Sequence, residues 1–296
     1  MTIGILLNTE AQHSIHRIQT IETLNKLHQV TIIDVSKVKQ YSPKHNMFWR
    51  LVRKLESKAF VKTSSLDVTN FTTVPSQFDL IGYKHFATEE TLKALGLLNL
   101  DVIIRYGLNV IEGAILDLPR FGIWSFHHGN PDLFRGSMPA FYEILFSQSR
   151  VSILLQRLSD RLDDGASLFQ ASFDVQWCWG KTYTNLLSQE SNILTMSLNS
   201  IFVKRPKDSM PLVTSTYRLS KSPSYFEVLR YSIKVAKNFS KLVISNNTPQ
   251  RWGIGITTIA NPKFQVASII DQQNKFSFVA DPFLFIENKR YLFFEG

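Results

Sequence analysis

Ser125 and His127 are separated by one residue within the segment IWSFH (123–127). This short apolar segment has the β-branched and aromatic composition of a buried strand. Side chains alternate along a strand, so Ser125 and His127 share one face while Trp124 and Phe126 share the other. An imidazole titrates near neutral pH and can therefore accept and return a proton. In open α/β sheets, ligands bind beyond the carboxyl ends of the strands. The pattern predicts a site for proton-transfer chemistry at this strand end.

A group of carboxylates follows later in the chain. The segment LSDRLDDGASLF (158–169) places Asp160, Asp163 and Asp164 ahead of a glycine turn. Together with Ser125 and His127, an aspartate here would complete a Ser/His/Asp set, which makes a hydrolase one alternative. The nucleophile elbow G-x-S-x-G is absent, however, and the serine and histidine would point side by side into one space, which argues against that alternative.

A strand ending in His, a loop ending in Arg-Gly and a later Leu-Asp-x-Gly turn together resemble the folate-dependent formyltransferase family. The matching residues here are Ser125, His127, Arg135-Gly136 and Leu162–Gly165. The doubled histidine of FHHGN looks most like the branch of the family that formylates sugar-nucleotide amines. The sequence departs from the family at one position, because the family's catalytic Asn is Ser125 here. The resemblance is weak before residue 101 and good over residues 101–170.

The resemblance implies an enzyme that transfers a formyl group from 10-formyltetrahydrofolate, as co-substrate, to a primary amine carried by an amino-sugar nucleotide. It assigns catalytic roles to three residues. His127 stabilises the oxyanion and transfers protons, Asp163 orients His127 and holds a water that carries protons, and Ser125 stands at the position that hydrogen-bonds the formyl oxygen. The residues that the resemblance assigns to the folate are Arg105, Tyr106, Gly107, Leu108 and Asp160.

Three residues are candidates for contact with the acceptor: His128, Asn130 and Arg135. We expect Gly129 to end the strand, which would make His128 a loop residue. Arg135 could bind a phosphate or fix its own loop. Residues 105–108 could also be an ordinary strand-to-loop transition.

Two other functions stay open. The change from Asn to Ser favours a catalytically degenerate protein of the same fold that binds folate or a sugar nucleotide. A methionyl-tRNA formyltransferase-like activity is the second alternative.

The N-terminal third predicts a strand–helix–strand unit. Ile3–Leu7 and Val30–Val35 have the composition of buried strands, and Ala11–Leu27 has the apolar spacing of a helix. Because such crossovers join parallel strands, we expect an α/β, Rossmann-like formyltransferase domain with a mainly parallel sheet over residues 1–180. The first turn lacks G-x-G-x-x-G, so a dinucleotide site is unsupported. Further predicted elements are the strands Leu100–Tyr106, Val151–Arg157 and Ser167–Val175 and the helices 88–98 (capped by Thr88), Val110–Leu118 and Met138–Phe146.

The sequence after residue 180 predicts a linker with helices over residues 181–250 and an all-β segment over residues 251–296. The sequence FVADPFLFIENKRYLFFEG (278–296) resembles the first blade of a five-bladed, glycosidase-like β-propeller. One blade cannot close a propeller. We therefore expect an incomplete propeller, and a chain that is a truncated product or a fragment.

Composition narrows the classes further. The 296 residues are 44% hydrophobic and 19% charged, which is typical of a globular protein. The single cysteine, Cys178, excludes an internal disulfide and a cysteine-based zinc cluster, and no histidine spacing predicts a metal site. No apolar run approaches the ~20 residues that span a bilayer, and the N-terminus lacks a signal pattern. We expect a cytoplasmic protein with no membrane anchor. A homodimer is also compatible with the sequence.

The net charge of +9 suggests anionic partners. No RNA-binding motif is present, so no nucleic-acid partner is expected. The densest basic cluster has the spacing of one face of a helix, and is either a solvated face or a docking surface for nucleotide phosphates or acidic lipid; it consists of Arg50, Arg53, Lys54, Lys58 and Lys62. The opposite, apolar face is expected to be buried; it consists of Phe48, Leu51, Val52, Leu55 and Ala59.

Overall fold

The computed structural model of the chain describes residues 1–40, 45–129, 134, 138–159, 166–203, 222–246, 254–256, 268–270, 280–286 and 290–295. The chain forms two compact units, Met1–Asn238 and Phe239–Gly296. Each unit is described by itself. The expected domain limits at residues 180 and 250 stay predictions.

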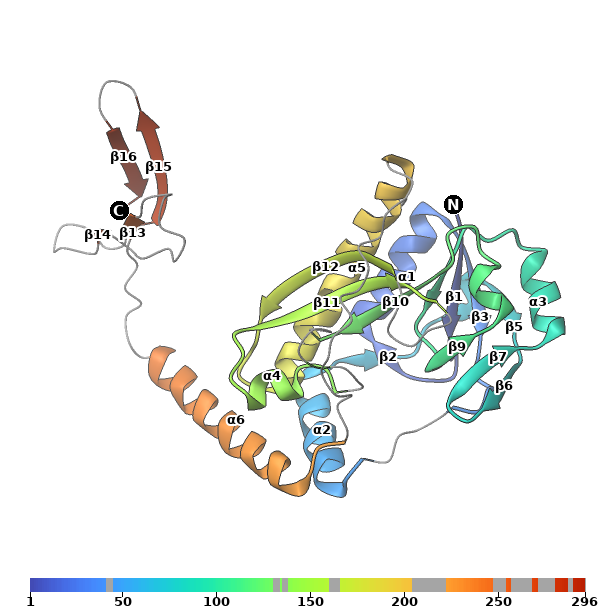
Figure 1. The fold of residues 1–296 in the computed structure, drawn as a ribbon, viewed down its shortest axis with the longest axis horizontal. Coiled ribbons are helices and arrows are strands. Elements are labelled where there is room, and N and C mark those ends of the chain that lie inside the picture. Colours follow the sequence, from blue (N-terminus) through green and yellow to red (C-terminus); the bar gives the residue numbers. More distant parts are fainter. Residues whose placement is uncertain are drawn as a thin grey trace. The chain divides into compact units, whose positions relative to one another are not determined.

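The first unit is built on a seven-stranded sheet with the order β12-β11-β10-β8-β1-β3-β5 (Figure 1). The five strands from β10 to β5 run parallel, whereas β11 and β12 are antiparallel to their neighbours. The expected α/β fold with a mainly parallel sheet is therefore confirmed. The strands are β1 (Thr2–Leu7), β3 (Gln29–Asp34), β5 (Thr72–Pro75), β8 (Val102–Arg105), β10 (Ile123–His128), β11 (Arg150–Arg157) and β12 (Ala166–Asp174).

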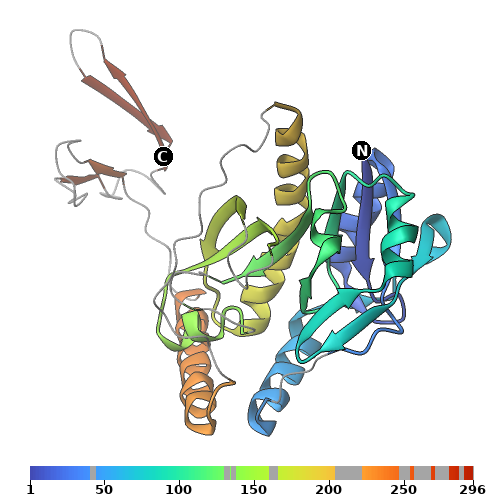
Figure 2. The same ribbon diagram turned by 45° about the vertical axis from the view of Figure 1, so that its right-hand side comes forward.

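Helices cover both faces of this sheet. Five of them contribute to one apolar core, and α3 contributes to the other together with η2 and β9. Helix α5 lies alongside β11 and β12 and against α1 (Figure 2). The helices are α1 (Ile15–Leu27), α2 (Met47–Phe60), α3 (Glu89–Gly96), α4 (Phe141–Leu145), α5 (Trp179–Val203) and α6 (Tyr225–Asn246).

Strand β10 shows how the two cores are divided. Ile123 packs in the core that contains α3, while Trp124 packs in the core that contains α1 and α5. Both side chains are almost fully buried, because a strand in the middle of the sheet is covered on both faces. The alternation predicted from the sequence is confirmed.

Smaller elements complete the unit. β2 (His13–Ser14) pairs with β4 (Thr63–Ser64), and β6 (Phe78–Ile81), β7 (Lys84–Ala87) and β9 (Val110–Glu112) form a second sheet beside α3 (Figure 1). Two 3₁₀ turns are η1 (Val68–Asn70) and η2 (Ala114–Asp117).

Three predicted helices differ from the structure. The helix expected over Met138–Phe146 begins only at Phe141, after Ala140 with φ of +65°. The segment Val110–Leu118 is not one helix, because Gly113, with φ of +87°, separates β9 from η2. Helix α1 begins at Ile15 rather than Ala11, since the preceding residues pair with β4 and the Ser14 hydroxyl caps the helix by accepting the Arg17 N–H at 3.2 Å. The predicted cap at Thr88 is confirmed by its bond from the Thr91 N–H at 3.3 Å.

Helix α2 buries a different face from the one expected. Phe48, Leu51 and Leu55 are 54%, 55% and 61% exposed, whereas Trp49 is 1% exposed. The inward stripe runs from Trp49 through Val52 and Glu56 to Phe60. The predicted face was chosen because it holds the most apolar residues, and this was wrong. The buried ring of Trp49 and the hydrogen-bonded carboxylate of Glu56 orient the helix instead.

In the second unit, the described strands form two antiparallel pairs, β13 (Ile254–Ile256) with β14 (Ser268–Ile270) and β15 (Ala280–Ile286) with β16 (Arg290–Glu295). The propeller interpretation stays a prediction. Among the described residues of the whole chain, no helix is both long and apolar enough to cross a bilayer.

The N-terminus of α5 is held by side chains from α2 and α6. The Glu56 carboxylate accepts the Gly180 N–H at 2.7 Å, and the Tyr231 hydroxyl accepts the Trp179 N–H at 2.8 Å. The same hydroxyl donates to Glu56 at 2.8 Å. These contacts satisfy two helix N–H groups that have no partner within the helix, and they place a negative charge at the positive end of its dipole.

Replacing Glu56 with Ala should therefore destabilise the first unit. The change leaves the Gly180 N–H and the Tyr231 hydroxyl without their acceptor, and hydrogen bonds to a charged group predict a loss of about 2–3 kcal/mol in unfolding free energy. Urea unfolding followed by tryptophan fluorescence measures it. Glu22→Ala on the exposed side of α1 is the matched control and should change little. Equal urea midpoints for the two variants would contradict this assignment.

Candidate functional site

The predicted site residues of β10 lie at the carboxyl edge of the sheet. Ser125 is paired in register with Arg105 of β8, and His127 with Leu154 of β11. Ser125 is 1% exposed, while His127 and Arg105 are partly exposed. Gly129, with φ of +126°, follows the strand. Arg105, Ser125 and His127 are therefore brought to neighbouring strand ends.

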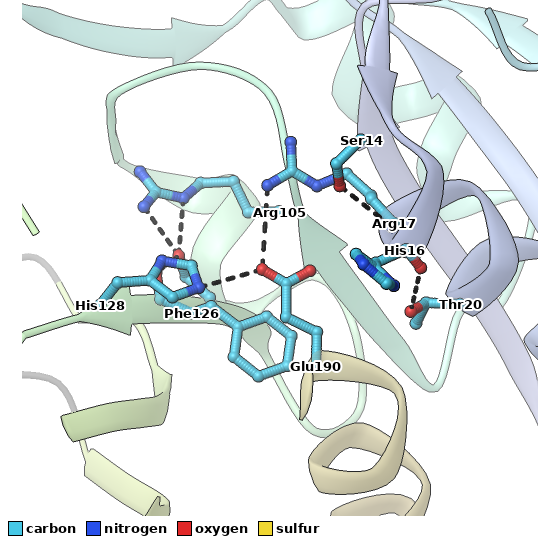
Figure 3. Close-up of polar contacts among 9 residues, drawn as sticks. Ser14, His16, Arg17, Thr20, Arg105, Phe126, His128 and Glu190 are labelled. Atoms are coloured by element: carbon cyan, nitrogen blue, oxygen red, sulfur yellow. Dashed lines mark hydrogen bonds and ion pairs between the residues drawn. The ribbon is translucent and has the colours of Figure 1, made fainter. Parts of the chain in front are cut away.

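Arg105 and Ser125 are joined directly. The Ser125 hydroxyl oxygen accepts hydrogen bonds from Arg105 Nε at 3.0 Å and from Arg105 Nη2 at 2.7 Å (Figure 3). Arg105 Nη1 also donates to the Leu108 carbonyl at 3.4 Å. The serine oxygen thus holds the guanidinium fork across two strands. A permanent positive charge therefore lies at this strand end, at a residue that the resemblance assigns to folate binding.

The residues after Arg105 make close backbone contacts. The N–H groups of Tyr106 and Gly107 both donate to the Leu6 carbonyl, at 3.0 and 2.8 Å. A Cβ at Gly107 would lie 2.8 Å from a methyl group of Val35, so a side chain does not fit there. Leu108 is buried in the core that contains α3. Their proposed contact with folate stays a prediction.

His128 belongs to the strand, contrary to the expectation that Gly129 would leave it in a loop. Because β10 continues through His128, the imidazole lies on the face opposite His127, with its ring 6.2 Å from that of Phe126 and 5.7 Å from that of Tyr183. Its Nε2 atom is 3.1 Å from Oε1 of Glu190 on α5.

Glu190 is the centre of a buried polar cluster that the sequence did not predict. The carboxylate is fully buried, and Nη2 of Arg17 on α1 lies 3.8 Å from Oε1, the same oxygen that His128 approaches (Figure 3). The Arg17 guanidinium also lies 4.5 Å from the centre of the Tyr106 ring. The Glu190 cluster consists of Arg17, Tyr106, His128, Tyr183 and Glu190.

The pKa directions in the cluster follow from its burial and its charges. Burial lowers the pKa of Arg17, but the Glu190 carboxylate, Tyr183 and Tyr106 together outweigh burial, so the pKa of Arg17 is raised. Burial also raises the pKa of Tyr106, and Glu190 raises it further. For Tyr183, burial raises the pKa although Arg17 opposes the shift. Both phenols therefore stay neutral at neutral pH.

The position of Glu190 in the sequence could have predicted that its carboxylate is buried and paired. It falls at helical spacing from Leu186, Leu187, Ile193 and Leu194, all of which are buried. A carboxylate inside an apolar stripe must find a cationic partner. The segment was instead interpreted as a linker with helices because of its many polar residues.

Several predicted site residues cannot be placed. Asp160, Asp163, Asn130 and Arg135 all lie outside the described residues, as do the Arg-Gly loop end and the Asp-Gly turn. Their assigned roles, and the proximity of Asp163 to His127, stay predictions. In the part of the chain that the structure does describe, no His, Cys, Asp or Glu residues cluster as metal ligands would. Burial raises the pKa of Cys178 to about 12, so this thiol is not a nucleophile at neutral pH.

The fold and site define an α/β protein with a histidine and an arginine–serine pair at the carboxyl edge of its sheet. No family model matches the chain. It is 27% identical over 124 residues to the methionyl-tRNA formyltransferase of Ureaplasma parvum, a match that covers 41% of this chain and 39% of that relative. The chain therefore spans about two fifths of the length of this curated relative. This similarity supports the resemblance to formyltransferases.

Two solved structures are also similar. A sugar N-formyltransferase from a Shewanella species is 12% identical, with a TM-score of 0.47 over 78% of this chain and 87% of that chain. The N-formyltransferase from Helicobacter canadensis, in complex with folinic acid and dTDP-3-aminofucose, is 12% identical, with a TM-score of 0.47 over 79% of each chain.

Removing the carboxylate of Glu190 should strongly destabilise the first unit. Glu190→Ala leaves the buried Arg17 charge uncompensated, and breaking a buried ion pair from one side predicts a loss of about 3–5 kcal/mol in unfolding free energy. Chemical denaturation of the two proteins side by side measures it.

Glu190→Gln separates charge from packing, because it keeps the size of the side chain and removes only the charge. We expect it to lie between the wild type and Glu190→Ala. If Glu190→Gln matched the wild type in stability, the ion pair would contribute nothing and the cluster would be held by packing alone.

Proposed function

We propose that the protein transfers a formyl group from 10-formyltetrahydrofolate to a primary amine on an amino-sugar nucleotide. The single observation that carries the proposal is that His127 and the Arg105–Ser125 pair lie at neighbouring strand ends at the carboxyl edge of the sheet. The sequence similarity to a methionyl-tRNA formyltransferase supports formyl transfer. The doubled histidine after Phe126 supports the sugar-nucleotide branch.

The reaction requires the protein to stabilise a negatively charged oxygen and to transfer a proton. The amine attacks the formyl carbon, and the carbonyl oxygen gains negative charge until the bond to the folate nitrogen breaks. The amine also loses a proton, which the leaving nitrogen must receive. We assign the proton transfer to His127, whose ordinary pKa lies near neutrality, and its orientation to Asp163.

We assign stabilisation of the negatively charged oxygen to Arg105, in place of the Asn that the family uses. Ser125 is buried at 1% exposure, and its oxygen accepts two N–H groups of Arg105. Ser125 therefore positions the guanidinium, and the partly exposed Arg105 brings charge and hydrogen-bond donors to the strand edge. A cation that is already oriented stabilises developing negative charge without reorganisation.

The proposal includes the cytoplasm as the place of action, because a buried free thiol suits a reducing compartment. A protein that binds folate or sugar nucleotide without turnover is the competing function, and the absence of the family Asn favours it. A methionyl-tRNA acceptor is the other alternative.

One experiment separates these functions. The full chain is incubated with 10-formyltetrahydrofolate and a panel of amino-sugar nucleotides, with methionyl-tRNA as a separate acceptor, and the products are analysed by mass spectrometry. A mass gain of one formyl group on an amino-sugar nucleotide is the expected result. Formylation of methionyl-tRNA alone would identify the alternative acceptor, and binding of folate without any formylated product would identify the degenerate protein.

Arg105→Ala should lower kcat by a factor of about 10²–10³, the loss typical of one donor to a developing oxyanion. Arg105→Lys keeps the charge but loses the fork and should lose less. Ser125→Asn should be nearly neutral, since the Asn carbonyl can still accept from Arg105. Steady-state kinetics of formyl transfer provide kcat and KM for each variant.

The double variant Arg105→Ala/Ser125→Ala provides the control for positioning. If Ser125 acts through Arg105, the double variant should be no slower than Arg105→Ala, because residues that act as a unit are not additive. Wild-type turnover in Arg105→Ala would show that the donor lies elsewhere, with Asn130 as the next candidate.

A further inference from the structure

Helices α2 and α6 of the first unit meet near their N-terminal ends (Figure 1). The side-chain amide of Asn46, which caps α2, donates a hydrogen bond to the carbonyl of Pro223, just before α6. The ring of Phe48 lies edge-on to that of Tyr225, with their centres 5.7 Å apart. Both rings are more than half exposed, so this contact between the helices lies at the protein surface.

Each helix continues from this contact with an exposed apolar stripe. Large apolar side chains recur on both helices at spacings of three and four residues, which places them on one side of each helix. All of them are at least half exposed, and together they form the α2–α6 apolar surface: Met47, Phe48, Leu51, Leu55, Tyr225, Phe226, Leu229 and Ile233. Scattered exposed apolar residues are ordinary, but a group of this kind marks an interaction site.

Basic side chains border the apolar stripe on each helix. On α2 they recur every four residues, and on α6 they recur at spacings of four and three, so each row runs beside the stripe of its own helix. These residues are exposed except for Lys234, which is partly buried; they are Arg50, Lys54 and Lys58 on α2 and Arg230, Lys234 and Lys237 on α6. Arg53 adds a further exposed positive charge on α2.

The carboxylates of the same two segments do not balance this charge at the surface. Over residues 47–60 and 225–238 the acidic residues are Glu56 and Glu227, and both are partly buried. Glu56 is bonded to Gly180 and Tyr231, and Glu227 accepts hydrogen bonds from the N–H and the hydroxyl of Ser224 at 2.7 and 2.9 Å. The charge that these two segments expose is therefore positive.

We propose that the α2–α6 apolar surface and its basic border bind the surface of an anionic lipid bilayer. The apolar side chains enter the boundary between headgroups and acyl chains, and the lysines and arginines lie among the negatively charged headgroups. Helices with Phe and Leu on one side and Lys and Arg beside it bind membranes in this way. Such binding requires no helix that spans the bilayer, and it is independent of the proposed formyl transfer.

The charges favour a bilayer over a second copy of the chain. A two-fold symmetric pair would place this surface against itself, so basic side chains would face basic side chains with no exposed carboxylate from either helix between them. The border also includes Lys54, Lys58 and Lys237, and lysine is depleted in interfaces between proteins. Lysine is common, in contrast, on helices that lie on anionic membranes.

Co-sedimentation of the full chain with lipid vesicles tests the proposal. One set of vesicles contains phosphatidylcholine and phosphatidylserine in equal amounts, and the other contains phosphatidylcholine alone. We expect the anionic vesicles to bind the protein at least tenfold more tightly, because only they attract the basic border. Equal binding to the two sets, or binding to neither, would overturn the proposal.

Two double variants locate the binding surface on the protein. Lys54→Gln/Lys58→Gln should weaken binding to anionic vesicles at least tenfold, because each basic residue near such a surface contributes a gain of about fivefold. Leu51→Ser/Leu55→Ser should also weaken it at least tenfold, because binding scales with the apolar area that enters the bilayer. All four side chains are exposed, so both variants should keep the urea midpoint of the wild type.

The matched controls make the same chemical changes elsewhere on the first unit. Lys37→Gln/Lys93→Gln removes two exposed charges, and Ile81→Ser/Leu97→Ser removes two exposed apolar side chains. Both controls should bind anionic vesicles as the wild type does. If each variant of α2 bound like its control, the α2–α6 apolar surface would not be the site and the proposal would be overturned.

Sedimentation velocity without lipid tests the second copy as the alternative occupant. We expect the wild type and Leu51→Ser/Leu55→Ser to have the same oligomeric state, because a bilayer rather than another chain covers these leucines. A wild type that is dimeric and a variant that is monomeric at equal concentration would assign the surface to a second copy and overturn the proposal.

Discussion

The alternation of side chains along β10 is the constraint on which the arrangement of polar groups in the first unit depends. Ser125 and His127 face one side of the sheet, while Phe126 and His128 face the other. All four lie near the carboxyl edge, so a single strand supplies polar groups to two faces. On one face Ser125 accepts hydrogen bonds from Arg105 of β8. On the other face His128 lies beside Glu190 of α5.

These two charged side chains are oriented in different ways. Arg105 is partly exposed, and its guanidinium donates two hydrogen bonds to the neutral hydroxyl of Ser125. Glu190 is fully buried and has a cation and an imidazole beside it, so its charge is used inside the protein. The first arrangement suits chemistry, and the second suits positioning. A shift of one residue in the register of β10 would exchange the two faces.

Local patterns in the sequence predicted the parts of this arrangement that depend on neighbouring residues. The strands β1, β3, β11 and β12, the cap at Thr88 and the shared face of Ser125 and His127 all follow from periodicity and composition. The hydrogen bonds between Arg105 and Ser125 depend on the register of two strands that are 20 residues apart, and no local pattern specifies that register. The proximity of Arg17, His128 and Glu190 depends on three elements at once, and it was missed for the same reason.

Helix α5 shows why such long-range contacts matter for function. Its first turn carries Trp179, which packs edge-on against Trp49 of α2, and its middle carries Glu190 beside His128. Its N-terminus is held by Glu56 and Tyr231, so the helix cannot shift along its axis without breaking those hydrogen bonds. The position of Glu190 beside the end of β10 is therefore set by a helix that is held at its N-terminus. A ligand at the end of β10 would meet side chains that are already in place, and less of its binding energy would be lost in ordering them.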